Sequence, residues 1–224
     1  MFLKKNNIYI LISSLFSFII FSSFTLTQKD NWQLAKDKNG IKIYIRNEEG
    51  SAIKSIKATM TFNASLSALT AIVMDVENYP QWVYHCKETK LIKNIAGKEL
   101  LYYHVTYAPW PVSYRDNISR FMVSQNKTDY SISITSSVIN GVLPEKSEYV
   151  RVKKSNASWN FKRVNKNTIA AEYTLSFDPG GNVPAWLINL FITEGPYDTF
   201  IKMKLLVDED KYKNASLPFI NESK

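Results

Sequence analysis

The order of strand-like and helical stretches is the feature that most constrains this fold. Hydrophobic alternation predicts six successive strands over residues 89–177, and the turn sequence Asp-Pro-Gly-Gly-Asn at 178–182 ends them. One long stretch with helical spacing follows over 183–207. Strands and helices do not alternate along the chain, which argues against a doubly wound parallel sheet.

The same pattern predicts an α+β fold. Strands at 41–46 and 53–62 precede a short helix at 65–75. A long, curved antiparallel sheet has an apolar face that needs a cover, and the C-terminal helix over 183–207, kinked by a Gly-Pro pair at 195–196, is the natural cover. A slot between a sheet and a helix is a common site for an apolar ligand.

The chain is long enough for one domain with a sizeable core. It has 224 residues, of which 45% are hydrophobic and 21% charged, and these values argue against a disordered chain. There is no internal repeat and no low-complexity linker. We therefore expect a single folded domain over 28–207, followed by a charged, flexible tail over 208–224.

Residues 1–27 differ in composition from the rest of the chain. Lys4 and Lys5 precede an apolar stretch over 8–24, and the chain then becomes polar, which is the order of a secretory signal. The apolar stretch is also at the lower limit of length for crossing a bilayer. We expect a signal peptide or, alternatively, an uncleaved N-terminal anchor, and an exported protein that is periplasmic or extracellular.

The net charge of +8 comes mainly from lysine, since only five of the 28 basic residues are arginine. The basic residues are spread thinly, so nucleic-acid binding is not expected, whereas a mild attraction to an anionic membrane surface is. Cys86 is the single cysteine, and His85 and His104 are the two histidines. We therefore expect no internal disulfide, no metal site and no cofactor.

One motif resembles a known family. Residues 108–116 read Ala-Pro-Trp-Pro-Val-Ser-Tyr-Arg-Asp, which is similar to the Pro-Trp-Pro-x-x-x-Arg-Asp signature of START domains, the lipid-transfer domains related to the steroidogenic acute regulatory protein. The resemblance extends over about residues 30–205 and implies a helix-grip fold with an internal hydrophobic tunnel, in an exported, bacterial-type member. Further segments that agree with the family in the same order are 32–44, 75–82, 149–151 with 158–159, and 178–186.

The resemblance and the strand and helix periods together indicate which residues line the tunnel. Residues of the strand around 103–107 would form a wall, and the C-terminal helix would form a roof. The predicted lipid-binding residues are Tyr103, Val105, Tyr107, Arg115, Leu187, Leu190, Phe191 and Ile201.

Two interpretations of Arg115 stay open. Its side chain meets a ligand head group as a charge in the tunnel, or it forms a buried ion pair with Asp116 or another acid. In some family members a tunnel arginine pairs with an acid on the preceding strand, but here that strand has no acid after Glu99.

The loop at Trp110 and the turn before the last helix are predicted to form a gate that docks on a membrane. A tryptophan between two prolines is a large apolar group on a stiff turn. The alternative is that Trp110 packs against the C-terminal helix. The predicted docking residues are Trp110, Val183, Pro184 and Trp186.

The sequence therefore predicts a monomeric, non-enzymatic protein that binds and carries a lipid or other hydrophobic ligand and contacts a membrane surface. One alternative is a cavity enzyme of the polyketide cyclase or aromatase type on the same fold, with His104, Arg115 and nearby tyrosines as its polar groups. Another is an envelope interaction protein without a ligand. No catalytic residue is assigned, because the neighbours His85 and Cys86 have no evident orienting carboxylate.

Overall fold

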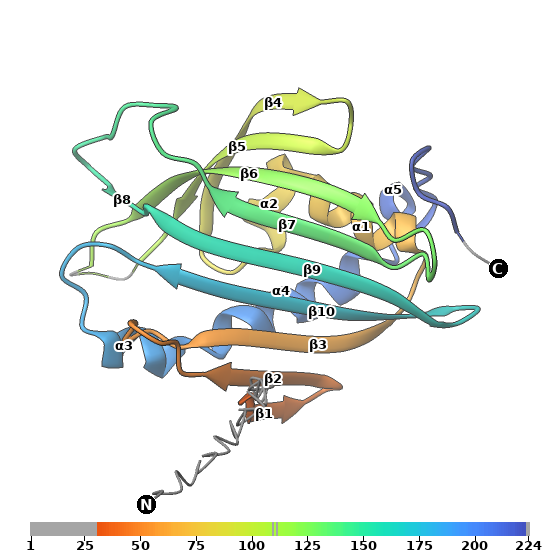
Figure 1. Cartoon of the computed structure of the whole chain (residues 1–224), viewed down its shortest axis with the longest axis horizontal. Coiled ribbons are helices and arrows are strands. Elements are labelled where there is room, and N and C mark those ends of the chain that lie inside the picture. Colours follow the sequence, from red (N-terminus) through yellow and green to blue (C-terminus); the bar gives the residue numbers. More distant parts are fainter. Residues whose placement is uncertain (1–30, 109, 111, 223–224) are drawn as a thin grey trace, which may run out of the picture. The chain divides into compact units, whose positions relative to one another are not determined.

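A ten-stranded sheet dominates the computed structural model, which describes residues 31–108, 110 and 112–222 (Figure 1). The strands lie in the order β1-β2-β3-β10-β9-β7-β6-β5-β4 and are paired antiparallel, and the short β8 pairs in parallel with β6. The strands are β1 (Gln33–Lys38), β2 (Ile41–Arg46), β3 (Ser55–Asn63), β4 (Cys86–Ile95), β5 (Glu99–Thr106), β6 (Arg115–Gln125), β7 (Ile132–Val138), β8 (Val150–Arg151), β9 (Lys154–Asn165) and β10 (Thr168–Asp178).

The helices lie on one side of this sheet and at its ends. In Figure 1, α1, α2 and α4 lie behind the sheet, α3 lies near its left end and α5 near its right end. The predicted α+β fold, a large antiparallel sheet with a C-terminal helical segment, is confirmed. The helices are α1 (Leu66–Met74), the 3₁₀ helix η1 (Val76–Asn78), α2 (Tyr79–Trp82), α3 (Ala185–Phe191), α4 (Glu194–Leu206) and α5 (Asp210–Lys213).

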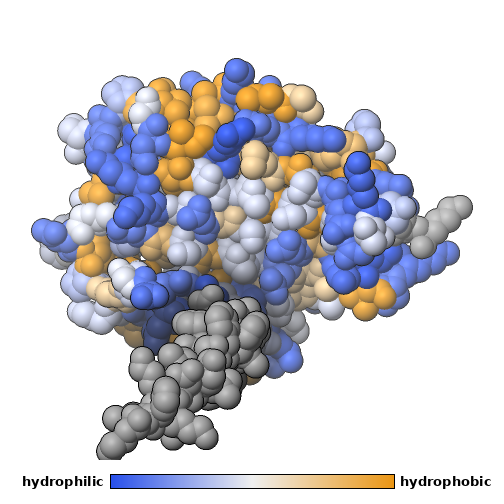
Figure 2. All heavy atoms as spheres, viewed as in Figure 1, coloured by the Kyte–Doolittle hydropathy of each residue, from blue (hydrophilic) through white to orange (hydrophobic). Residues whose placement is uncertain are grey.

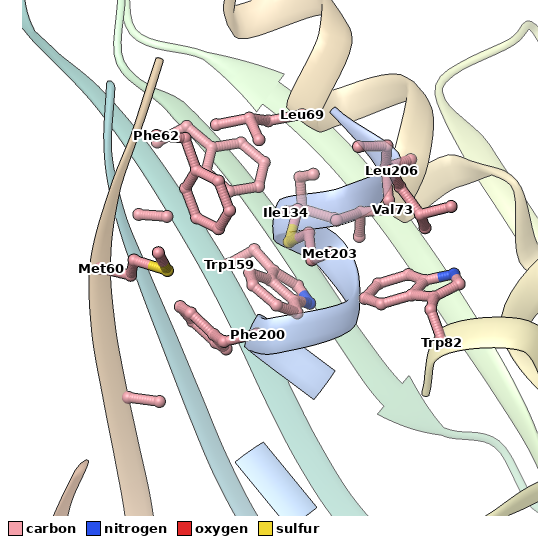
Figure 3. Packing of buried hydrophobic residues seen from close by; sticks show 14 of the residues in the cluster. Met60, Phe62, Leu69, Val73, Trp82, Ile134, Trp159, Phe200, Met203 and Leu206 are labelled. Atoms are coloured by element: carbon pink, nitrogen blue, oxygen red, sulfur yellow. The ribbon is translucent and has the colours of Figure 1, made fainter. Parts of the chain in front are cut away.

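The core lies between α4 and the inner face of the sheet (Figure 3). Phe200 and Met203 of α4 are fully buried, and they recur at the spacing that keeps side chains on one face of a helix. Trp159 of β9 stacks on Phe200, with the two ring centroids 5.3 Å apart. Trp159 also packs against Trp82 of α2, so this indole joins the sheet to two helices.

The opposite face of the sheet carries polar side chains. Thr135 and Ser137 on β7, and Asn160 and Lys162 on β9, are exposed and alternate with residues that are buried or half-buried. Figure 2 looks onto this face, whose middle is mostly blue and pale. This alternation is typical of an antiparallel sheet with one covered face.

The C-terminal helical stretch is divided into α3 and α4 by a break at Ile192 and Thr193. Pro196 has no N–H to donate to the carbonyl of Ile192, four residues earlier, and its ring would clash there. It lies instead in the first turn of α4, where a proline is tolerated. The predicted single helix over 183–207 is thus two helices, with the interruption just before the Gly-Pro pair.

The charged C-terminal segment is folded, so the prediction of a flexible tail over 208–224 is wrong for its described part. Tyr212 on α5 is only 1% exposed, and its hydroxyl donates a hydrogen bond to Asp75 at 2.6 Å. Phe219 and Ile220 pack against the main core. Charge along the segment predicted fraying, but these apolar side chains hold it to the domain.

Glu222 near the end of the chain caps α1. Its carboxylate accepts hydrogen bonds from the backbone N–H of Ser67 at 2.7 Å and of Leu66 at 3.3 Å. The first N–H groups of a helix lack partners within the helix and attract negative charge. The Ser65 hydroxyl accepts from the N–H of Ala68 at 3.0 Å, so Ser65 is the N-cap of α1.

The N-terminal segment predicted as a signal peptide or anchor, residues 1–27 with the apolar stretch 8–24, lies outside the described residues. Within the described part of the chain, no helix combines the length and the apolar character that a membrane span requires.

Candidate functional site

A cavity of about 480 Å³ lies between the inner face of the sheet and the helices α3 and α4. Its sheet wall comes from alternate residues of β5, β6, β7, β9 and β10, because side chains on one face of a strand recur at every second position. The segment between α2 and β4 completes the wall. Small-molecule sites typically have volumes of about 300–1,000 Å³.

Most of the cavity lining is apolar. One side of α3 forms part of it, since residues three and four positions apart share a helix face. This lining would exclude water from a hydrocarbon chain. Its apolar members include Trp159 of β9, Leu175 and Phe177 of β10, and Leu187, Ile188 and Phe191 of α3.

The part of the wall formed by β5, β6 and β7 carries several polar side chains beside the apolar Phe121 and Ile134. The hydroxyl oxygens of Tyr102 and Ser136 lie 3.4 Å apart, and Ser119 Oγ donates to Asn117 Oδ1 at 2.9 Å. The polar lining residues of these strands are Tyr102, His104, Thr106, Arg115, Asn117, Ser119 and Ser136.

Four of the predicted lipid-binding residues line the cavity: Tyr107, Arg115, Leu187 and Phe191. Tyr107 follows the last residue of β5, and its N–H donates to the carbonyl of His85 at 2.7 Å. The strand alternation has ended there, which allows the Tyr107 ring to reach the cavity.

The prediction that Tyr103 and Val105 line the cavity is wrong. Neither residue is among the lining residues; both are buried with Ile118 in a separate small cluster. Tyr102, His104 and Thr106 line the cavity instead. The even-numbered positions of β5 therefore face inward, and the sequence pattern was assigned one residue out of phase.

The predicted roof residues Leu190 and Ile201 are also outside the cavity lining. Leu190 is 63% exposed and is not among the lining residues of α3. Ile201 packs against the main core from α4. The break before α4 changes the helical phase, so one period extended from 183 to 207 fails at Ile201, whereas Leu190 lies before the break and was placed on the lining face wrongly.

The predicted docking residues gather around α3 and the loop after β5. Trp110 is 92% exposed, so it does not pack against the C-terminal helices. Trp186 of α3 is 68% exposed, and Pro184 is an exposed residue at the N-cap of α3. Val183 lines the cavity instead. A membrane role for these residues stays a prediction.

Arg115 binds backbone carbonyls rather than a carboxylate. Its Nε and Nη2 donate to the carbonyls of Pro179 and Gly180, both at 3.3 Å, and its Nη1 donates to the carbonyl of Ser113. Burial lowers the pKa of this guanidinium. The side chain fastens the start of β6 to the turn after β10, at the rim of the cavity. The ion pair with Asp116, one of the two interpretations of Arg115, is not formed.

Asp116 pairs with Arg151 of β8 instead, at distances of 2.7 and 2.9 Å. The hydroxyl of Tyr103 donates to the same carboxylate at 3.0 Å. Burial alone would raise the pKa of Asp116, but hydrogen bonds from Arg151 and Tyr103 outweigh it and lower the pKa. A signal for a separate partner is present in the sequence, because an acid beside Arg115 on a strand faces the other side of the sheet.

The histidines and the cysteine near the cavity are not arranged for nucleophilic chemistry. Burial raises the pKa of Cys86 to about 12, so it remains a thiol at neutral pH. The His85 ring stacks on Tyr84 with centroids 3.8 Å apart, and burial lowers its pKa. Burial also lowers the pKa of His104 to about 4, which makes that imidazole neutral.

Similar proteins share this architecture and much of its length. The chain is 28% identical over 170 residues to an uncharacterized protein of Pseudomonas aeruginosa, covering 76% of this chain and 83% of that protein. It is 26% identical over 193 residues to the phosphatidylcholine transfer protein of Rattus norvegicus, covering 83% and 87%.

Solved structures give the same result. The crystal structure of a STAR-related lipid transfer protein from Xanthomonas axonopodis has a TM-score of 0.75 and 28% identity, covering 80% of this chain and all of that fragment. Human STARD10 has a TM-score of 0.69 at 19% identity, covering 78% of this chain and 72% of that one, a likeness of fold. The START domain model matches residues 21–206. This chain belongs to the START domain family.

Proposed function

We propose that this protein binds a lipid or another hydrophobic ligand in its cavity and carries it through water. The observation that carries the proposal is the mostly apolar cavity of about 480 Å³ between the sheet and the helices. Each methylene group removed from water contributes about 0.8 kcal/mol, so a sixteen-carbon chain gains on the order of 12 kcal/mol from such an enclosure. The names of related proteins, phosphatidylcholine transfer protein and STAR-related lipid transfer protein, support it.

Helix α3 is the proposed gate and membrane contact. It carries no charged residue, and none of its residues is buried, although Leu187 and Phe191 line the cavity. Its other side exposes Trp186 and Leu190 to water. A helix with apolar residues on both sides is stabilised when both sides are shielded from water. This would happen to α3 if one side contacted the ligand and the other side contacted the membrane surface.

The positive charge supports an attraction to anionic lipids. The full chain has a net charge of +8. Removal of residues 1–27 takes away Lys4 and Lys5 and no acidic residue, which leaves 26 basic and 20 acidic residues, or +6. Anionic surfaces attract basic groups within about one Debye length.

The proposal includes a non-enzymatic, monomeric protein exported from the cytoplasm. Neutral His104 and protonated Cys86 argue against an activated nucleophile or a charged acid–base pair in the cavity. The basic start and apolar stretch of residues 1–27 support export. N-terminal sequencing of the exported protein should begin near Leu26 or Gln28. A chain recovered from the cytosol with Met1 intact would contradict export.

Lipid mass spectrometry of the purified protein tests the carrier function. Gentle purification followed by solvent extraction should yield a lipid in stoichiometric amount. The same protein should accelerate transfer of a fluorescent phosphatidylcholine from donor to acceptor vesicles of matched composition. Consistent absence of both a bound lipid and transfer would favour the cyclase-like enzyme or the ligand-free interaction protein.

A further inference from the structure

Two polar side chains lie opposite one another inside the cavity. His104 of β5 and Asn117 of β6 are direct partners in the antiparallel register, and both line the cavity. Directly opposed residues on one sheet face have Cβ atoms about 4.5–5.5 Å apart. The imidazole and the amide are therefore available to the same part of a bound ligand.

The hydrogen-bonding capacity of this pair is not used within the protein. His104 Nε2 is buried and has no partner among the described residues. Asn117 Oδ1 accepts from Ser119 Oγ, and the Asn117 amide nitrogen has no acceptor within the described part of the chain. Trp82 Nε1, on another wall of the cavity, is a further buried donor without a partner there. Buried polar groups are normally paired, so His104 Nε2 and Trp82 Nε1 call for a partner from outside the protein, and the Asn117 amide lies beside the first of them.

The chemistry of the pair favours an uncharged partner. The His104 imidazole is neutral at physiological pH because burial lowers its pKa to about 4. Among the described residues that line the cavity there is no acid and no lysine, and the guanidinium of Arg115 is engaged by the carbonyls of Pro179 and Gly180 at the rim. A neutral imidazole and an amide NH₂ recognise an oxygen with lone pairs, such as a hydroxyl or a carbonyl.

We propose that His104 and Asn117 form a recognition site inside the cavity for an uncharged oxygen of the ligand, a hydroxyl or an ester carbonyl. This inference rests on the proposed function and specifies which hydrophobic ligands the cavity accepts. A monoacylglycerol satisfies the pair, whereas a plain hydrocarbon offers neither group a hydrogen-bond partner. Sites built around hydrogen bonds discriminate strongly against analogues that lack the bonding group.

The test uses two probes with sixteen-carbon chains, 1-hexadecanoylglycerol and hexadecane. Titration is followed by intrinsic fluorescence, since Trp82 and Trp159 line the cavity. His104→Phe and Asn117→Val should each weaken binding of 1-hexadecanoylglycerol about fivefold and leave hexadecane binding unchanged. Asn160→Val, on the exposed face of β9, is the matched control and should change neither affinity.

A second measurement is made on the native protein, and variants serve only to assign its signals. The chain has two histidines, so the imidazole ¹⁵N spectrum of the native protein contains two sets of signals, assigned with His104→Phe or His85→Phe. 1-Hexadecanoylglycerol should shift the Nε2 signal of His104, and hexadecane should not. Two results would overturn the recognition site: normal binding of 1-hexadecanoylglycerol without this shift, or binding by the folded His104→Phe and Asn117→Val variants as tight as by the native protein. Either result would leave the proposal of lipid binding standing. Failure of the native protein to bind either probe would contradict the proposed function itself.

Discussion

The guanidinium of Arg151 donates to both carboxylate oxygens of Asp116, from Nε at 2.7 Å and from Nη2 at 2.9 Å. Both side chains are almost completely buried, at 4% and 1% exposure. Arg151 also donates to the carbonyls of Leu143 and Pro144 at 3.1 Å. The pair therefore holds the loop before β8 against the start of β6. Strand β6 also contributes to the cavity wall.

Removal of one partner from this pair should destabilise the domain strongly. Arg151→Met leaves the Asp116 carboxylate buried without its counter-charge, which costs about 3–5 kcal/mol. Lys153→Met removes an exposed ion pair with Glu145 and should change stability by less than about 1 kcal/mol. Urea unfolding of both variants measures the difference, and equal effects would contradict the buried role of Arg151.

The same pair predicts a loss of stability in acid. The pKa of Asp116 is lower in the folded than in the unfolded protein, where it is near the ordinary value of about 3.9. A group of this kind stabilises the fold above its unfolded pKa, and the contribution disappears as pH falls through its folded pKa. The stability difference between the native protein and Asp116→Asn should therefore be largest at neutral pH and shrink below about pH 4. A difference that is constant with pH would contradict this assignment.

The two sides of α3 predict a difference between neighbouring leucines. Leu187→Trp places a larger ring into the cavity and should weaken lipid binding about tenfold, by analogy with overpacking costs of about 1–3 kcal/mol. Leu190→Trp adds the same ring on the exposed side and should leave binding in solution unchanged. Titration with 1-hexadecanoylglycerol in the absence of vesicles compares them. Equal affinities would show that the ligand does not reach α3.

The sequence predicted most of the strands but not all of their phases. Turn residues such as Gly97 and Gly141 marked strand ends well, because glycine accepts the positive φ that both adopt. The inward face of β5 was missed, since Tyr102 to Thr106 are aromatic, polar and β-branched in no clear alternation. Either phase buries apolar side chains there, and only the packing of Val105 against Ile118 decides between them.

Long-range contacts explain the other errors. The 208–222 segment is charged, and nothing local in it predicts that Tyr212 will reach Asp75 or that Glu222 will reach the first N–H groups of α1. The unpaired Nε2 of His104 likewise depends on surroundings that several strands and helices create together. Periodicity reports which face of an element is apolar, and it does not report which distant partner meets that face.

The cap that Glu222 forms at the N-terminus of α1 should contribute modestly and locally to stability. Glu222→Ala removes the acceptor for two N–H groups of α1 and the ion pair with Arg163, and should cost about 1 kcal/mol, or about 2–4 °C in Tm. Glu145→Ala removes a surface ion pair and serves as the control. Amide hydrogen exchange in the first turn of α1 should increase in Glu222→Ala only. Unchanged exchange there would contradict the capping role.

Trp110 provides the sharpest test of membrane docking. It is 92% exposed, so its indole contributes little to the folded core, and Trp110→Ala should leave the Tm unchanged within about 1 °C. Insertion of a tryptophan side chain removes about 150–250 Å² from water, which corresponds to about 4–6 kcal/mol at about 25 cal/mol per Å². Trp110→Ala should therefore weaken association with anionic phosphatidylcholine–phosphatidylserine vesicles and slow lipid transfer.

The matched control for this prediction is Val164→Ala, another exposed apolar residue, at the end of β9 opposite the end where Lys154 pairs with Asp178 before the turn into α3. It should change neither vesicle association nor transfer. Sedimentation with vesicles at low and high salt separates the two contributions, because salt screens the attraction of the basic surface and leaves the apolar insertion of Trp110 intact. The deficit of Trp110→Ala should therefore persist at high salt. If the variant sediments like the native protein at both salt concentrations, the loop after β5 does not contact the bilayer, and docking has to be assigned to Trp186 and Leu190 of α3.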